Sequence, residues 1–356
     1  MIKTIEKRLR AGKFVLIAEI GVNYYDIAKK LNISNIEAAK LMILEAKNAG
    51  IHAVKFQTYK AETIAAKNSP SYWDTNEEKT TSQYALFKKY DSFGDYEYTQ
   101  LANFCNEIGI EFCSTPFDFN SSDYLYDLMN VYKISSSDIS NLPFISYIAK
   151  KNKPIILSIG AANLDEIQEA VSTIKRYNKK KITLLHCVLE YPTPYQDANL
   201  AKIKTLKDTF PDMYIGYSDH TKPDSEYDVI EVAYLLGAQL IEKHFTLDKS
   251  LTGNDHYHAM DVHDAEEILT HIEKIDKIRG CGDLVALPTE SAARQNARRS
   301  IVTTKSILKG TTFTSDMLTF KRPGTGIPPR NIGSVIGRKA SKDLPEDKIL
   351  QNEDIE

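Results

Sequence analysis

The sequence has few cysteines, a single tryptophan and no long hydrophobic run. Its four cysteines, Cys105, Cys113, Cys187 and Cys281, show no Cys-x-x-Cys spacing. This argues against a disulfide scaffold or a structural zinc site and indicates thiols that stay reduced in a cytoplasmic protein. No apolar run approaches the ~20 residues that a membrane-spanning helix needs, and residues 1–10 lack the apolar core of a signal peptide. We therefore expect a cytoplasmic location and no membrane partner.

An excess of either sign of charge is also missing. The 356 residues include 45 basic and 48 acidic side chains, a formal net charge of −3. This balance gives no reason to expect nucleic acid as a partner. With 42% hydrophobic and 26% charged residues, the chain has the composition of a soluble globular protein long enough for two domains.

What the sequence does contain is a regular alternation of short β-like and longer helix-like segments. Helical patterns lie at residues 35–49, 96–108, 164–177 and 225–236, and Gly50, Gly109 and Gly237 stand where helix C-caps belong. Eight such βα units predict an α/β fold, a (β/α)₈ TIM barrel over residues 1–279. The predicted strands are residues 14–20, 53–57, 110–115, 131–135, 155–159, 182–187, 213–218 and 238–244.

The composition changes after the barrel. Residues 280–299 read as a linker with a short helix, and residues 300–356 are rich in Gly and Pro, with short strands predicted at 300–304 and 318–321. So small a module has a marginal core, and we expect it to pack on the barrel or on another subunit. Within the barrel, residues 60–95 form a long insertion that we interpret as a lid, an interface loop or a mobile loop without function.

Polar side chains stand at the carboxyl ends of all eight predicted strands. TIM-barrel enzymes build their active sites from these ends. Capping explains one polar strand end, but it does not explain eight in register. The candidate site residues are Glu19, Asn23, Lys55, Gln57, Thr115, Lys133, Ser135, Ser136, Ser158, His186, Asp219, His220, Glu242 and His244.

Two histidines end consecutive predicted strands. His220 and His244, with Glu242 nearby, could converge on a divalent metal beside a bound substrate. The alternative is two separately hydrogen-bonded histidines. His256 and His258, in the loop after the last strand, are further candidate ligands, although their spacing fits substrate contact or packing better.

Two lysines also stand at strand ends. Lys55 and Lys133 would be costly inside a barrel mouth unless they meet an anion or perform chemistry. Schiff-base chemistry is one reading. Binding of a phosphate or carboxylate is the other, and it fits the neighbouring hydroxyls of Ser135, Ser136 and Ser158 better. If neither holds, the lysines extend into water.

Seven of these motifs resemble those of bacterial sialic acid synthases, in the same order along nearly the whole chain. They are residues 19–23, 55–57, 114–118, 133–136, 191–194, 216–221 and 242–246. The segment Lys-Arg-Pro-Gly-Thr-Gly-Ile at residues 321–327 resembles the antifreeze-like (SAF) domain of the same enzymes. The resemblance implies a TIM barrel followed by a small β-rich SAF domain.

The resemblance also implies a reaction, one of carbohydrate and polysaccharide biosynthesis. Phosphoenolpyruvate would condense with the open-chain aldehyde of an N-acylated hexosamine, either N-acetylmannosamine or a 2,4-diacetamido-trideoxyhexose. A nine-carbon 2-keto-3-deoxy sugar acid and phosphate would result, by C–O cleavage. A divalent metal, Mn²⁺ first and Mg²⁺ or Co²⁺ as alternatives, would be held by His220 and His244 and polarise the aldehyde oxygen.

Further roles follow from the same resemblance. Arg322 would reach into the barrel of a partner subunit and touch the sugar, which implies a domain-swapped homodimer. Residues expected to bind phosphoenolpyruvate are Lys55, Thr115, Lys133, Ser136 and Ser158. Residues expected around the sugar and the attacking water are Gln57, Tyr191, Asp255 and Glu242. The residues expected to carry catalysis are Lys55, His220, Glu242 and His244.

Three segments depart from the family pattern. Tyr24-Tyr25-Asp26 replaces His-Asn-Gly or His-Glu-Gly, Leu189 replaces a sugar-binding Asn, and residues 254–258 replace a form containing Pro-Asp. All three lie where the sugar is expected, so the identity of the acceptor stays open.

Two other functions are compatible with parts of the sequence. A related barrel synthase of the 3-deoxy-octulosonate 8-phosphate type needs extra cations for a sugar phosphate, and beyond the barrel mouth only Arg322 and Arg330 suggest themselves. A non-catalytic carbohydrate-binding protein is suggested by the antifreeze-like segment. It would not need Lys55, Lys133 and a two-histidine metal site together.

Overall fold

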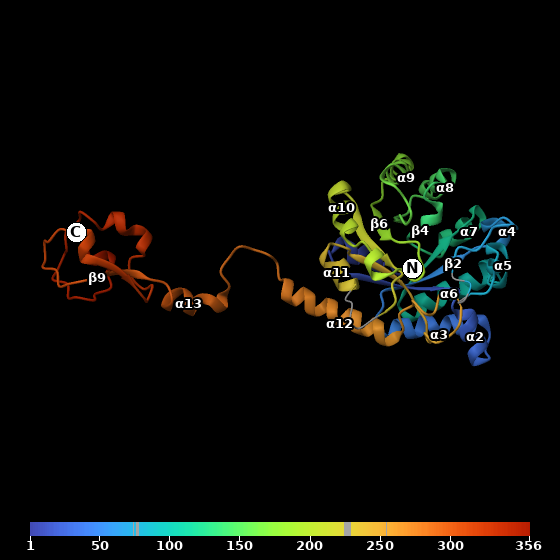
Figure 1. The fold of residues 1–356 in the computed structure, drawn as a ribbon, viewed down its shortest axis with the longest axis horizontal. Coiled ribbons are helices and arrows are strands. Elements are labelled where there is room, and N and C mark those ends of the chain that lie inside the picture. The colour runs from blue at the N-terminus through green and yellow to red at the C-terminus, as the bar shows by residue number, and fades with distance from the viewer. Residues whose placement is uncertain (74, 76–77, 224–228, 254) are drawn as a thin grey trace. The chain divides into compact units, whose positions relative to one another are not determined.

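The chain divides into two compact units. The computed structural model describes residues 1–73, 75, 78–223, 229–253 and 255–356. The units are Met1–Arg279 and Gly280–Glu356, both visible in Figure 1. Each unit has a hydrophobic core of its own.

The first unit is a nearly closed barrel of eight parallel strands, which confirms the predicted fold (Figure 1). The strands pair in the order β3-β2-β1-β8-β7-β6-β5-β4, so β3 and β4 are the two ends of the ladder. Each predicted strand is present with ends that differ by two residues or fewer. The strands are β1 (Val15–Gly21), β2 (Ala53–Thr58), β3 (Glu111–Pro116), β4 (Tyr132–Ile134), β5 (Ile155–Ser158), β6 (Ile182–Cys187), β7 (Tyr214–Asp219) and β8 (Leu240–His244).

Helices follow the strands around the barrel. The predicted helices at residues 35–49, 96–108 and 164–177 are α3, α6 and α9, and the one at 225–236 is α11, with residues 225–228 outside the described part of the chain. Backbone φ is positive at Gly50, Gly109 and Gly237, as the predicted caps require. The helices are α2 (Tyr24–Leu31), α3 (Asn35–Asn48), α4 (Ala61–Ile64), α5 (Gln83–Lys89), α6 (Asp95–Ile108), α7 (Phe119–Tyr124), α8 (Leu142–Lys150), α9 (Leu164–Tyr177), α10 (Ala201–Thr209), α11 (Val229–Leu235) and α12 (Val262–Arg279).

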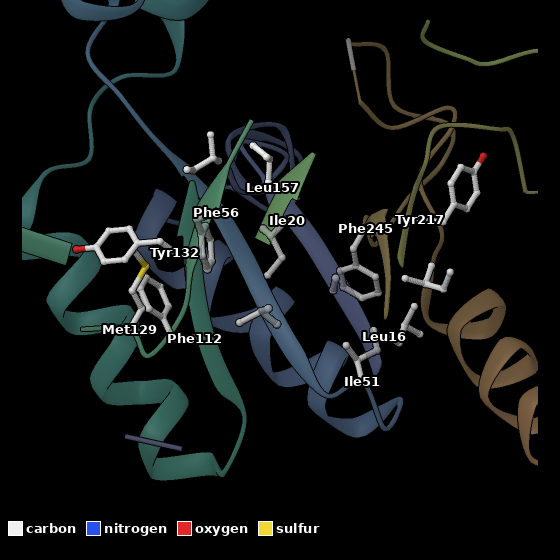
Figure 2. Packing of buried hydrophobic residues seen from close by; sticks show 14 of the residues in the cluster. Leu16, Ile20, Ile51, Phe56, Phe112, Met129, Tyr132, Leu157, Tyr217 and Phe245 are labelled. Carbon is white, nitrogen blue, oxygen red and sulfur yellow. The ribbon is translucent and has the colours of Figure 1, made fainter. Parts of the chain in front are cut away.

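Alternation along the strands sorts their side chains into two sets, because successive residues point to opposite faces. The outward set packs with the helices into the main core, part of which, including Phe56, Phe112 and Tyr132, is shown in Figure 2. The inward set is apolar near the strand starts and polar near the strand ends. The apolar layer inside the barrel consists of Val15, Ile17, Ala53, Cys113, Val131, Ile156, Leu185 and Leu240.

An additional helix, α1 (Thr4–Arg10), covers the amino-terminal end of the barrel. This helix was not predicted from the sequence. Ile5 and Leu9 join the apolar layer inside the barrel, and the backbone N–H of Ile5 donates to the Glu111 carboxylate at 2.6 Å. Burial raises the pKa of Glu111 to about 7, against the opposing effect of this hydrogen bond.

The insertion at residues 60–95 contains α4 and α5 and has internal hydrogen bonds. Lys60 Nζ donates to the carbonyls of Asp91 and Phe93, at 2.6 and 2.8 Å. A function of this segment as a lid or an interface stays a prediction. Across the described residues, no helix is long and apolar enough to cross a membrane.

The second unit is small and β-rich, as expected. The linker region contains the short helix α13 (Ser291–Asn296), and β9 (Ser300–Thr303) pairs antiparallel with β10 (Leu318–Lys321). Both strands lie where the sequence predicted them. The core of this unit is centred on Ile301, Ile307, Phe313, Val335, Leu344 and Leu350.

Candidate active site

The polar layer of the barrel surrounds a cavity at the carboxyl ends of the strands. The structure therefore brings most of the predicted site residues together. Those that line the cavity are Glu19, Lys55, Gln57, Thr115, Lys133, Ser135, Ser136, Ser158, Tyr191, His220, Glu242 and His244. The cavity is also lined by Phe117, Cys187 and Ser218, for which no site role was predicted. Leu189, noted only as a departure from the family pattern, lines it as well.

Four buried charges lie at the centre of this cavity. Lys55 Nζ lies 2.5 Å from Glu19 Oε2 and 3.7 Å from Glu242 Oε1, and Lys133 Nζ lies 3.0 Å from the same Glu242 oxygen. Although burial would raise it, the nearby Lys133 and Lys55 lower the pKa of Glu242 to about 2. Burial raises the pKa of Glu19 and lowers that of Lys133. Glu242 is therefore an ionised carboxylate at neutral pH.

Hydroxyl groups beside the lysines complete a set of hydrogen-bond donors. Lys55 Nζ donates to Thr115 Oγ1 at 3.0 Å, and Ser136 Oγ accepts from the N–H of Gly160 at 2.8 Å. Ser158 Oγ is buried and has no hydrogen-bond partner among the described residues. An unpaired buried hydroxyl costs roughly 1–3 kcal/mol, which is recovered if a ligand accepts from it. The arrangement suits a bound anion.

A second group at the cavity edge has the chemistry of a metal site. The candidate ligand atoms of His244, Asp255 and His258 all lie within 4.8 Å of one another. Within the described chain, His244 Nδ1 and both ring nitrogens of His258 lack hydrogen-bond partners. Burial lowers the pKa of both histidines well below its usual value. Neutral imidazoles and a carboxylate fit a divalent transition metal.

His220, the other predicted ligand, lies next to this group. Its Nδ1–H donates to the carbonyl of Val188 at 2.7 Å, and its ring centroid is 5.6 Å from that of His244. Burial lowers the pKa of His220 to about 4, so its Nε2 is free of a proton. The convergent set found in the described chain, however, includes His258. The sequence pointed to His258 as a candidate, but its loop spacing gave no reason to prefer it.

Asn23 holds the loop after β8 that carries Asp255 and His258. Its side-chain amide donates to the carbonyls of Phe245 and Asp255, at 3.0 and 3.4 Å. Asn23 is absent from the lining of the cavity. Its hydrogen bonds give it a role in positioning Asp255, and the expected contact with substrate stays a prediction.

His186 and Asp219, also predicted at the site, have partners on the outward side of the barrel. His186 Nε2 contacts the carbonyl of Ala198 at 2.7 Å, and its ring stacks on that of Tyr217. Asp219 forms a buried ion pair with Lys243. Neither residue lines the cavity. The sequence placed both at strand ends correctly, but strand alternation turns their side chains away from the interior.

The structure places the segments that depart from the family pattern in different surroundings. Tyr24 is fully buried and stacks on Tyr25 and Phe93, with ring centroids 4.7 Å apart in each case. It belongs to the core, which corrects its expected place near the sugar. Leu189 does line the cavity. Arg322 is exposed in the second unit, just after β10, and its role in a partner's barrel stays a prediction.

Comparison with known proteins shows the family of the chain. Residues 42–283 match the NeuB family and residues 298–356 match the SAF domain. The N,N'-diacetyllegionaminic acid synthase of Campylobacter jejuni is 38% identical over 349 residues, which cover 95% of this chain and 99% of that protein. The synthase of the same name from Legionella pneumophila is 36% identical over 348 residues, 96% and 94% of the two chains. A crystal structure of N-acetylneuraminic acid synthetase from Leptospira borgpetersenii superposes with a TM-score of 0.68 at 33% identity, over 79% of this chain and 90% of that one. The chain therefore belongs to the NeuB family and carries a SAF domain after its barrel.

Proposed function

We propose that the protein is a nonulosonic acid synthase. It condenses phosphoenolpyruvate with the aldehyde of an N-acylated hexosamine and releases phosphate. The relatives of known activity support the class of product. The observation that carries the proposal is one barrel mouth in which the buried Lys55, Lys133 and Glu242 lie beside the His244–Asp255–His258 group.

The lysine side of the cavity would bind phosphoenolpyruvate. The ammonium groups of Lys55 and Lys133 match its carboxylate and phosphate, and the hydroxyls of Thr115 and Ser158 donate further hydrogen bonds. Because these groups are buried and held by Glu19 and Glu242, they need little reorganisation when the anion enters.

The bonds change in two steps. C3 of phosphoenolpyruvate forms a bond to C1 of the aldehyde, whose oxygen takes up a proton. Water adds its oxygen to C2 and loses one proton through the ionised Glu242, which balances the proton taken up by the sugar oxygen. The C–O bond to phosphate then breaks, and the remaining hydroxyl proton leaves with the phosphate as the ketone forms. His244, Asp255 and His258, with His220 adjacent, would hold a divalent metal, which would supply Lewis-acid polarisation of the aldehyde oxygen.

The deciding experiment measures inorganic phosphate released from phosphoenolpyruvate with Mn²⁺ present. The sugar panel contains N-acetylmannosamine, mannose, 2,4-diacetamido-trideoxyhexoses and arabinose 5-phosphate. We expect release with an N-acylated sugar only. Release with arabinose 5-phosphate alone would favour the sugar-phosphate synthase, and sugar binding without release would favour a carbohydrate-binding protein.

The metal group is tested in the same assay. His258→Ala and His220→Ala are expected to abolish metal-dependent release, whereas His263→Ala, on the exposed face of α12, is the matched control. Full activity in both site variants, or activity unchanged by a chelator, would contradict the metal's role. Equilibrium dialysis with Mn²⁺ reports on loss of the site independently of activity.

We also propose the domain-swapped homodimer, with Arg322 touching the sugar in the partner's barrel. Its support is the small size of the second unit and the likeness to the SAF domain. Light scattering measures the oligomeric state. Mixing Arg322→Ala with His258→Ala chains tests the exchange, because only a swapped dimer regains one intact site.

A further inference from the structure

A second cavity, of about 270 Å³, lies at the amino-terminal end of the barrel, at the opposite end of the strands from the candidate active site. Its polar contributors include Glu111, Asn130 and Thr183. The helix α1 forms one wall, and the starts of the strands form the others. The apolar lining consists of Ile5, Leu9, Val131, Pro154 and Ile156, with the ring of Tyr214 beside them.

Polar residues also contribute to the lining of this cavity. Thr183, which is 3% exposed, lines it beside the apolar wall. Glu111 lines the same space, and its Oε2 accepts from the backbone N–H of Ile5 at 2.6 Å. A hydroxyl and a carboxyl group in an otherwise apolar wall suit a ligand with a polar substituent.

The mouth of the cavity is positively charged. Lys179, Lys180 and Lys181 line it together, in the turn between α9 and β6. The Lys181 ammonium lies 4.2 Å from the centroid of the Tyr214 ring. The Lys180 ammonium has no ion-pair partner within the part of the chain described. Since the acidic side chain at this mouth, Glu6, is paired with Arg10 on α1, the lysines give the entrance a net positive field.

We propose that this cavity binds a small molecule with a flat apolar body and one anionic group, a carboxylate or a phosphate. Its volume exceeds the ~150 Å³ that accommodates benzene in a protein core and approaches the lower limit of small-molecule pockets. The apolar wall and the Tyr214 ring take the flat body, and Lys180 and Lys181 take the anion. The proposal does not depend on the proposed function of the barrel mouth.

The test uses three probes on the full chain: 1-naphthoate, 1-naphthyl phosphate and the neutral 1-naphthalenemethanol. Isothermal titration is expected to show binding of an anionic probe at about 100 µM or tighter, and at least about 10-fold weaker binding of the neutral one. Which anion binds more tightly identifies the head group. Absence of binding by both anions up to millimolar concentration would overturn the proposal.

Variants locate the binding. The double variant Lys180→Glu, Lys181→Glu should weaken the anionic probes at least about 10-fold. Lys202→Glu, Lys204→Glu, a pair of exposed lysines on α10 outside the cavity, should leave them unchanged. Equal binding by both double variants, or displacement of the probe by excess phosphoenolpyruvate, would overturn the proposal. Thermal unfolding establishes that each variant is folded.

Discussion

At the scale of single residues, Ser158 and Ser136 are neighbours in the cavity lining with opposite hydrogen-bond states. Ser158 Oγ is buried without a partner in the described chain, whereas Ser136 Oγ accepts from Gly160. We predict that Ser158→Ala weakens phosphoenolpyruvate binding about 5- to 10-fold without loss of stability, because no bond is broken in the free protein. Ser136→Ala should lower the free energy of unfolding by about 1 kcal/mol.

Two measurements check this pair, the KM for phosphoenolpyruvate and the midpoint of urea unfolding. If Ser158→Ala is destabilised as much as Ser136→Ala, its hydroxyl has an internal partner and the prediction fails. An unchanged KM in Ser158→Ala would separate this residue from the anion site.

Leu189 lines the cavity where the family resemblance implies a sugar-binding Asn, so we expect it to affect the choice of acceptor sugar. A leucine offers no hydrogen bond, so a sugar hydroxyl buried against it loses roughly 1–3 kcal/mol, and a deoxy position loses nothing. We predict that the protein prefers a 2,4-diacetamido-trideoxyhexose and that Leu189→Asn raises kcat/KM for N-acetylmannosamine relative to it by at least about 10-fold. An unchanged ratio would place the deoxy position of the sugar away from Leu189.

A site residue could be predicted from the sequence where its position near the end of a strand is enough to place it in the cavity. Lys55, Lys133 and Glu242 were found because each stands near a strand end and faces inward. His186 shares that position in the sequence but faces outward, which its residue type does not reveal. The contribution of His258 depends on how a loop folds back over the barrel, and local sequence carries no periodic signal for that.

At the scale of secondary structure elements, α1 depends on a carboxyl group whose protonation is tied to folding. The pKa of Glu111 is raised to about 7 in the folded protein, so the folded state binds this proton more tightly than the unfolded chain. The stabilisation is complete below the unfolded pKa and is lost as pH rises through about 7. We predict that stability falls by up to about 3 kcal/mol across this window and that Glu111→Gln removes the fall.

Urea unfolding between pH 5 and pH 8 measures this dependence. Glu107→Gln, on the exposed face of α6, serves as the matched control and should keep the wild-type slope. A Glu111→Gln variant that still loses stability over this range to the same extent would show that another group is responsible.

The contact between β7 and β8 leaves no room for a side chain at one position. A Cβ atom on Gly216 would lie 2.4 Å from the carbonyl oxygen of Leu240 and 2.5 Å from Leu185 Cδ2. We predict that Gly216→Ala lowers the free energy of unfolding by about 1–3 kcal/mol. Gly333→Ala, where the Cβ meets no atom within 4 Å, is the control and should change it little. Comparable losses in both would contradict the prediction.

The elements that could be predicted are those with a clear period or a clear end. All eight strands follow from short apolar runs, and α9 was predicted with its observed ends because its apolar residues recur at helical spacing. The helix α1 was missed because it has seven residues, with only Ile5 and Leu9 buried. This helix packs on the apolar layer at the amino-terminal end of the barrel, a tertiary contact that local sequence does not reveal.

At the scale of the whole molecule, two cores are joined by an exposed segment. Ile278 at the end of α12 is 85% exposed, and Leu284 in the linker is fully exposed. We predict that limited digestion with subtilisin cuts first between residues 280 and 287 and yields two fragments that resist further cleavage. Mass spectrometry identifies the cut. Cleavage starting inside the barrel, or protection of the linker at every protease concentration, would contradict this expectation.

The order of the two units could be predicted because composition changes sharply at their junction. Their mutual placement could not, because it depends on contacts that local patterns do not encode. The family resemblance supplied the expectation of a swapped dimer, and the sequence by itself indicated only a small module with a marginal core.

The apolar layer across the barrel interior limits the paths by which molecules can enter and leave the cavity. Because Ile17, Leu185 and Leu240 seal the bore below the lysines, a molecule that reaches the polar layer from the rim must return to the rim to leave. Reactants and products then enter and leave through the same opening of the barrel. Under the proposed function, the sugar acid left at the end of a turnover would stand between the next phosphoenolpyruvate and the two lysines, and its departure would set when the next cycle can begin.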